Sequence, residues 1–338
     1  MRLIGCDLHA SQQSIAMLDR DTGAVIEKTL KHEGEAVREF YASVRPPVVV
    51  GIEATGSIGW FLRLMEELAV ECRVGHPVAI RKAESRRQKH DRRDAALLLQ
   101  LLAEDRFPTI WMPSTELRDL RALLLHRHQW VRMRTRVQNA LHAIAMAHGV
   151  RRGHTLWNRE GQALLASLPL APHTAHRRSE LQALYQHLDA HVDRLGEPIK
   201  HVADERPRAT LLMTHPGVGA VTALATEAFV GDPCRFPDGK AVASYVGMIP
   251  SEYSSGTRQR LGALSKQGNP FLRFLWCEAA AHAVRRDRNL QRFYQRKVVE
   301  KGFAKARVAA ARKLGIRLWI MLRDQIAEFC RRGLARRS

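Results

Sequence analysis

Short strand-like runs alternate with helical stretches along the first 112 residues. The first runs with strand composition are Arg2–Asp7, Ser14–Leu18 and Val25–Lys31. Helix formers follow in residues 34–44, Val48–Ile52 is apolar throughout like a buried strand, and Trp60–Val70 has apolar positions at helical spacing. Three strands, a helix, a strand and then alternating helices and strands are the order of an α/β RNase H-like domain. We predict that fold for residues 1–112.

Residues 113–205 have the apolar spacing of long helices. Ser114 can cap a helix from Thr115 to about His148, and a second stretch from Ser179 to about Ile199 has Leu and Val spaced by threes and fours. The residues between them are rich in Arg, His, Pro and Gly, which is typical of a connection. The pattern predicts an antiparallel helical hairpin or coiled coil for dimerisation, with helix packing inside one domain as the alternative.

Residues 206–338 form a third predicted domain that is mainly helical. The segment Pro216-Gly217-Val218-Gly219 lies between an apolar run and the helical stretch Ala220–Phe229, as in a helix-hairpin-helix. In such a motif, Gly217 and Gly219 let backbone amides approach a phosphate at a helix amino terminus. Any tight turn between two helices can use the same residues, so this signal is weak by itself.

Four acidic residues occupy positions that can converge. Asp7 and Glu53 close two apolar strand runs, while Asp91 and Asp94 are spaced i, i+3 at the start of an apolar helical stretch. In an RNase H-like domain such residues meet at one edge of the sheet, where carboxylates can hold Mg²⁺ beside phosphates. The alternatives are helix capping by the Asp pair, solvated acids at strand ends, and ion pairs with the neighbouring arginines.

The charge of the chain indicates a polyanionic partner. Its 338 residues contain 54 Lys+Arg and 34 Asp+Glu, a net charge of +20, and the 21 basic against 6 acidic residues after Pro250 carry most of the excess. Solubility requires much less charge, so nucleic acid is the partner we expect. Five scattered cysteines without zinc-site spacing favour a reducing, cytoplasmic setting. We expect neither a signal peptide nor a membrane span.

A serine-rich segment precedes several basic residues. Tyr253-Ser254-Ser255-Gly256 is followed by four positions that we predict to hold phosphates: Arg258, Arg260, Lys266 and Arg273. A serine in these surroundings can act as a nucleophile, with guanidinium groups stabilising a phosphorane-like transition state. A polar hairpin turn is the alternative.

Several of these segments together resemble the DEDD transposases of insertion-sequence family 110, to which the Piv-type DNA invertases are related. In the amino-terminal half the resemblance rests on Ile4-Gly5-Cys6-Asp7, Ile52-Glu53-Ala54-Thr55-Gly56 and Asp91-Arg92-Arg93-Asp94-Ala95. In the other half it rests on Pro216-Gly217-Val218-Gly219, Ala243-Ser244-Tyr245-Val246-Gly247, Tyr253-Ser254-Ser255-Gly256 and Ser265-Lys266-Gln267-Gly268-Asn269. It therefore extends over nearly the whole chain.

The resemblance implies a RuvC-like first domain whose four acids match Asp7, Glu53, Asp91 and Asp94. It also implies a nucleophilic serine, which falls on Ser255 when Gly256 is the anchoring glycine and on Ser254 otherwise. Members of the family move an insertion sequence through a circular intermediate and use a noncoding RNA encoded by the element. Their site is composite, with acids and serine from different protomers of a tetramer. The expected setting is bacterial and nucleoid-associated.

Our interpretation is a DNA transposase that uses Mg²⁺, a serine nucleophile and an element-encoded guide RNA, and that acts as a dimer or tetramer. Two other readings stay open. One is a metal-only RuvC-like nuclease that cuts junctions or RNA with water as the nucleophile. The other is a non-catalytic nucleic-acid-binding remnant of a decayed element.

Overall fold

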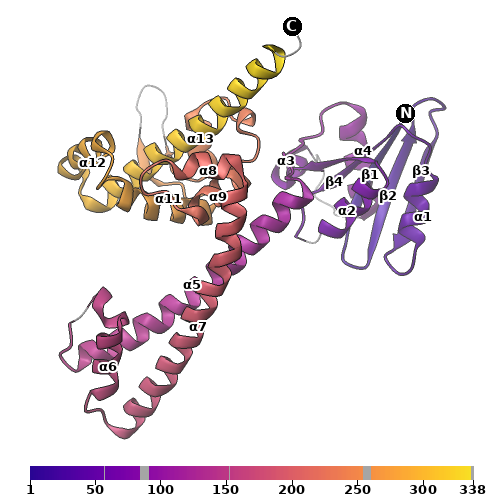
Figure 1. Ribbon diagram of the computed structural model, residues 1–338. Helices are drawn as coiled ribbons and strands as arrows, with labels where there is room; N and C mark the ends of the chain where they lie inside the picture. The colour runs from indigo at the N-terminus through magenta and orange to yellow at the C-terminus, as the bar shows by residue number, and fades with distance from the viewer. Residues whose placement is uncertain (57, 84–90, 152, 254–259, 336–338) are drawn as a thin grey trace. The chain divides into compact units, whose positions relative to one another are not determined.

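The computed structural model describes residues 1–56, 58–83, 91–151, 153–253 and 260–335, without the side chains of residues 91, 92, 261 and 326–335. The chain divides into two compact units, Met1–Thr115 and Glu116–Ser338 (Figure 1). Each unit has an apolar core of its own. Among the described residues, none of the helices combines the length and the apolar composition that a membrane span requires.

The first unit contains a mixed five-stranded sheet with the order β3-β2-β1-β4-β5. Its strands are β1 (Arg2–Leu8), β2 (Gln12–Asp19), β3 (Val25–Lys31), β4 (Val48–Glu53) and β5 (Glu71–Gly75). β2 is antiparallel to both β1 and β3, and β4 is parallel to both β1 and β5. This sheet with helices between its strands has the mixed α/β character predicted from the sequence, consistent with an RNase H-like domain.

Helices cover both faces of this sheet because the side chains of each strand alternate between the faces. The faces of β1 and β4 that carry Ile4, Cys6 and Ile52 pack against α1 (Ala36–Ser43) and α2 (Gly59–Glu67). The opposite faces, with Leu3 and Val49, pack against α4 (Asp91–Ala103) through three of its apolar residues: Ala95, Leu99 and Leu102. A short helix, α3 (Pro77–Ala83), precedes α4, and Ile80 of α3 packs against it. The central strands β1 and β4 are therefore buried on both sides, while β3 at one edge of the sheet is mostly exposed.

Two long helices begin the second unit: α5 (Thr115–Ala147) and α7 (Pro172–Glu205). They run antiparallel (Figure 1). Trp130 of α5 contacts His191 of α7, and Arg134, which comes later in α5, binds Asp189, which comes earlier in α7. α7 begins seven residues before the predicted start, since Pro172 fits the first turn of a helix. The predicted connection between them also contains a short 3₁₀ turn, His154–Trp157, and a helix, α6 (Arg159–Ser167).

The core of the second unit surrounds α9 (Ala220–Val230), whose residues from Thr222 to Val230 are all buried. The other helices of this region are α8 (Pro207–Met213), α10 (Gly239–Tyr245), α11 (Pro270–Ala283), α12 (Arg288–Lys301) and α13 (Phe303–Ala335). Trp276 of α11 is fully buried, and its indole N–H donates a hydrogen bond of 3.0 Å to Thr226 Oγ1 of α9. The 3₁₀ turn Pro233–Arg235 and the strands β6 (Pro250–Glu252) and β7 (Leu261–Leu264) complete the unit.

Candidate active site

Asp7 and Glu53 lie at the same edge of the first unit's sheet. β1 and β4 are parallel neighbours in which Cys6 is paired with Ile52, so the next residue in each strand is one of the two acids. Parallel strands bring their carboxyl ends to a common edge, which is where open α/β sheets carry their ligand sites. The side chain of Asp7 is 15% exposed, and Glu53 is half-buried.

Both acids belong to the face of the sheet that α4 covers. Leu3, Gly5 and Asp7 point to one side of β1 because side chains alternate along a strand, and Leu3 packs against α4. The same alternation puts Glu53 on the side of Val49, which also packs against this helix. The helix that begins at Asp91 and the two strand-end acids therefore lie on the same side of the sheet.

Glycine at position 5 allows α4 to approach β1 closely. A Cβ atom on Gly5 would lie 2.2 Å from the carbonyl oxygen of Ala95 and 2.4 Å from the amide nitrogen of Leu99, so any side chain here would push the helix away. Asp94 immediately precedes Ala95 and is half-buried. The first turns of α4 thus contact β1 two residues before Asp7, and the carboxylate of Asp91 lies outside the described side chains.

His9 is a member of this region that our sequence reasoning missed. Its Nε2 atom is 3.0 Å from Oδ2 of Asp7, and its side chain is 38% exposed. The signal was available, since residues two apart at a strand end face the same side. A histidine at this position can orient the Asp7 carboxylate or exchange a proton with a group bound next to it.

The donor atoms at this edge suit a hard cation. Asp7 and Glu53 at this edge and Asp94 on the neighbouring helix carry carboxylate oxygens, the ligands that Mg²⁺ prefers, and His9 contacts Asp7. In the part of the chain with described side chains, no group of three or more His, Cys, Asp or Glu is close enough to hold a metal ion. The type of donor therefore fits Mg²⁺, while a complete ligand set would require these acids to come closer together and Asp91 to join them.

The predicted serine motif belongs to the second unit. Ser254, Ser255 and Arg258 lie outside the described residues, but the residues on either side of residues 254–259 are fixed. The backbone N–H of Tyr253 donates to the carbonyl of Arg260 at 2.8 Å, and Glu252 pairs with Leu261 across the antiparallel strands β6 and β7. A two-stranded ribbon therefore holds both ends of the segment that carries the two serines.

Comparisons with known proteins agree with both regions. A family model described as DEDD transposase of the IS110 type matches residues 4–147, and a model of the transposase IS116/IS110/IS902 family matches residues 209–295. The two matches include the acid-bearing sheet edge and the residues on both sides of the serine segment. The chain belongs to the IS110 family of DEDD transposases.

Full-length relatives of this transposase come from several bacteria. A probable family 20 transposase of Pseudomonas aeruginosa is 29% identical over 94% of this chain and 96% of its own length. The transposase for insertion sequence element IS1111A of Coxiella burnetii is 25% identical, covering 98% of this chain and 92% of the relative. The transposase for element IS1328 of Yersinia enterocolitica is 24% identical over 82% of both chains. The similarity thus spans both compact units.

The basic residues predicted to bind phosphate have different surroundings in the transposase. Arg260 and Lys266 are exposed. Nη1 of Arg273 donates hydrogen bonds to the carbonyls of Val246, at 2.7 Å, and Lys266, at 3.3 Å. Arg273 therefore joins the segment after α10 to the segment after β7, and a contact of this side chain with phosphate stays a prediction.

The two glycines of the predicted helix-hairpin-helix also differ in their surroundings. Gly217 has a φ of +86°, and a Cβ on it would lie 2.6 Å from the backbone nitrogen of Ala283, so this glycine packs the turn between α8 and α9 against α11. Gly219 is exposed, precedes the first residue of α9 and has open space where a side chain would be. Of the two glycines, Gly219 is the one beside the solvent-facing first turn of a helix.

Proposed function

We propose that this transposase recombines DNA by transferring a strand to Ser255 at a site prepared by the DEDD acids. The observation that carries the proposal is the parallel register of β1 and β4, in which Asp7 and Glu53 follow a paired Cys6 and Ile52 under the helix that carries Asp94. That arrangement is what a phosphate-binding carboxylate site requires, and the family acts on insertion sequences.

Asp7, Glu53, Asp91 and Asp94 would hold Mg²⁺ in this proposal. Bound Mg²⁺ neutralises charge on the scissile phosphate and on the leaving oxygen. By holding the metal, the carboxylates would set the place of the phosphate for in-line attack, and His9 would fix the orientation of Asp7 through their 3.0 Å contact.

The covalent step exchanges one phosphoester for another. Oγ of Ser255 loses its proton and forms a bond with the phosphorus atom, while the bond from phosphorus to a sugar oxygen breaks and that oxygen takes a proton. Because the number of phosphoester bonds does not change, the reverse step with a new sugar hydroxyl rejoins the strand without a nucleotide cofactor. Ser254 is the other candidate for the nucleophile.

The proposed partners are DNA, an element-encoded guide RNA and further copies of the chain. The net charge of +20 supports nucleic-acid partners. The acids and the serine segment belong to different compact units, which is compatible with a composite site built from two protomers of a dimer or tetramer. The antiparallel helices α5 and α7 would act as the dimerising coiled coil, and the α8–α9 turn as a helix-hairpin-helix with Gly219 facing phosphate. A protein with these partners would work at the bacterial nucleoid.

A single assay tests this proposal. The full-length protein is incubated with its RNA, Mg²⁺ and end-labelled DNA that carries the element junction, and the products are denatured and separated by size. Transfer to serine predicts labelled DNA that migrates with the protein and becomes free after protease treatment.

The other readings predict different products from the same reaction. A metal-only nuclease yields free DNA ends without an adduct, and a non-catalytic binding protein yields intact DNA. Either product, obtained with folded protein, contradicts the proposal. Adduct formation by Ser255→Ala but not by Ser254→Ala assigns the nucleophile to Ser254 instead.

A further inference from the structure

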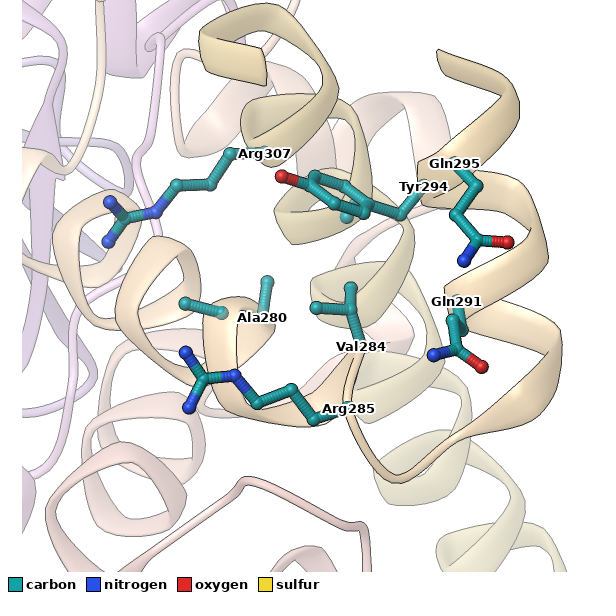
Figure 2. Close-up of a pocket in the computed structure, with 9 residues that line it drawn as sticks. Ala280, Val284, Arg285, Gln291, Tyr294, Gln295 and Arg307 are labelled. Atoms are coloured by element: carbon teal, nitrogen blue, oxygen red, sulfur yellow. The ribbon is translucent and has the colours of Figure 1, made fainter. Parts of the chain in front are cut away.

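A cavity opens between three helices at the carboxy-terminal side of the second unit. It has a volume of about 410 Å³ and lies between α11, α12 and the first turns of α13 (Figure 2). Its floor consists of small residues: Ala280 is 1% exposed and Ala310 is fully buried. The volume is within the range of sites that hold small organic groups.

Polar side chains without partners surround this floor. Within the described part of the chain, the Arg285 guanidinium, the Gln291 and Gln295 amides and the Tyr294 hydroxyl make no hydrogen bond or ion pair to other protein groups. Arg307 is fixed instead, because its Nη2 binds Glu278 Oε1 at 2.6 Å and its Nε donates to the Cys277 carbonyl. An apolar floor with a few uncommitted polar groups is the usual composition of a ligand site.

The lining residues are arranged by chemical type. In Figure 2, Arg285 and Arg307 extend to one side of the cavity, and Gln291 and Gln295 lie on the other. The Tyr294 ring lies between these two pairs, above the floor. One side of the cavity is therefore cationic through Arg285, because Arg307 is paired with Glu278, and the other side offers amide donors and acceptors. The aromatic ring of Tyr294 lies between the two sides.

We propose that this cavity takes a single unpaired nucleobase from the DNA on which the transposase acts. A flat base can lie on the alanine floor and stack on the Tyr294 ring. The glutamine amides match the donor and acceptor pattern of a base edge. Arg285, which has no ion-pair partner among the described residues, suits a phosphate next to the base in the strand. The inference rests on the proposed function only in that DNA is the substrate.

The surrounding charge favours a base within a strand over a free neutral ligand. Arg286 and Arg288 follow Arg285 in the chain, and both are exposed. Such charges attract the phosphates that flank an extruded base. A neutral ligand would gain nothing from them.

The test uses the full-length protein and three fluorescein-labelled DNA duplexes. One duplex has a single unpaired adenine, the second has an abasic residue at that position, and the third is fully paired. Binding is measured by fluorescence anisotropy at fixed salt. We expect the wild type to bind the unpaired adenine about tenfold more tightly than the abasic residue, the size of one base stacked on an aromatic side chain.

Two variants should weaken the recognition of the unpaired base, and a third should leave it unchanged. Tyr294→Leu keeps an apolar side chain but removes the aromatic ring, and Gln291→Ala changes an exposed residue that the folded core does not need. Tyr294→Leu should lower the tenfold preference to less than twofold, and Gln291→Ala should lower it severalfold. Arg292→Gln, an exposed neighbour that does not line the cavity, is the matched control. It should weaken binding of all three duplexes equally.

Several outcomes would overturn the inference. They are equal binding of the adenine and abasic duplexes by the wild type, or an unchanged preference in both cavity variants. Complete displacement of the adenine duplex by millimolar adenosine monophosphate would identify a site for free nucleotides instead. The adduct assay separates this inference from the proposed function. Wild-type protein that forms adducts without a base preference refutes the cavity assignment alone, and a base preference without adducts refutes the serine transfer alone.

Discussion

At the residue scale, Asp7 is defined by its position and its neighbour. Its carboxylate is 15% exposed, ends the central strand of the sheet and contacts His9. A carboxylate that only solvated a strand end would not need an imidazole beside it. The contact with His9 instead holds the carboxylate in one orientation at the edge of the sheet, as a metal ligand would require.

We therefore expect Asp7→Asn to reduce DNA strand cleavage about 100-fold or more while the protein stays folded, because a neutral amide is a poor Mg²⁺ ligand. The reaction is followed by the rate of adduct formation under saturating DNA. The melting temperature, measured by circular dichroism, should change by no more than a few degrees.

Asp19→Asn is the matched control for this substitution. Asp19 is also 15% exposed and also ends a strand, but it lies opposite Arg2 at the other edge of the sheet and pairs with that residue at 2.9 Å. Its replacement should leave cleavage within about twofold of the wild type, because the lost ion pair costs at most about 1 kcal/mol of stability and lies far from the acids. Equal losses in both variants would mean that Asp7 is a structural acid.

At the element scale, the contact between α4 and β1 determines where Asp94 lies. Gly5→Ala puts a methyl group against the backbone of Ala95 and Leu99, so the helix must move. We expect a loss of about 1–3 kcal/mol in the unfolding free energy, as for other overpacked cores, together with slower cleavage. Urea denaturation measures the first and the adduct assay the second.

Gly59→Ala is the control for Gly5→Ala, because it adds the same methyl group at a position with open space. Gly59 begins α2, and the atom nearest to a Cβ there is the tip of Arg63, at 3.9 Å. This variant should be as stable as the wild type or more stable by up to about 1 kcal/mol. If Gly5→Ala is as stable as Gly59→Ala in urea denaturation, the close contact of α4 with β1 at Gly5 is contradicted.

Asp287 connects the start of α12 with α13. It caps α12 by accepting the Leu290 N–H at 2.9 Å, and Arg317 of α13 binds it. Partial burial acts to raise the pKa of Asp287, but the Leu290 N–H and Arg317 outweigh it, so the pKa lies below its ordinary value. The carboxylate therefore contributes stability above the unfolded-state pKa of about 3.9 and loses it as the pH falls through the lower folded-state pKa.

Asp287→Ala should accordingly lower the unfolding free energy by about 1–2 kcal/mol at pH 7, mostly through the lost cap. The difference from the wild type should shrink as the pH falls below about 4, because the unfolded wild-type chain then binds a proton at this carboxyl more readily than the folded chain does. Urea denaturation between pH 3 and pH 7 measures both. A difference that is constant over this range would contradict the ionised cap.

The elements that could be predicted are those with a local signal. Alternation and apolar runs gave the strands that carry Asp7 and Glu53, and helical spacing gave most of α5. The helix α6 was missed because Arg, His and Gly around it are typical of connections. The contact of His9 with Asp7 had a local signal that we did not use, because the two residues are two apart at a strand end. The close approach of α4 at Gly5 and the cavity beside Tyr294 join residues that are distant in sequence. No periodicity reports such contacts.

On the scale of the whole molecule, the excess of basic residues is the property that most affects DNA binding. The residues after Pro250 carry 21 basic and 6 acidic side chains, and many of the basic ones are exposed on α12 and the start of α13. Contacts to phosphate release counterions, so binding must weaken with salt. If about six phosphates are contacted, raising the salt from about 50 to about 200 mM should weaken DNA binding about 1,000-fold. Anisotropy titrations measure the slope, and an affinity that does not change with salt would contradict an electrostatic footprint.

The acids belong to one compact unit and the serine segment to the other. The account therefore depends on whether the residue that becomes linked to DNA lies in the second unit, so this residue must be identified. The covalent product is isolated, digested with nuclease and protease, and analysed by mass spectrometry for the peptide that retains a nucleotide. The account predicts the nucleotide on Ser255, and its absence from this peptide when Asp7 is replaced by Asn. A nucleotide on a residue outside Tyr253–Gly256, or cleaved DNA with no peptide attached, would contradict it.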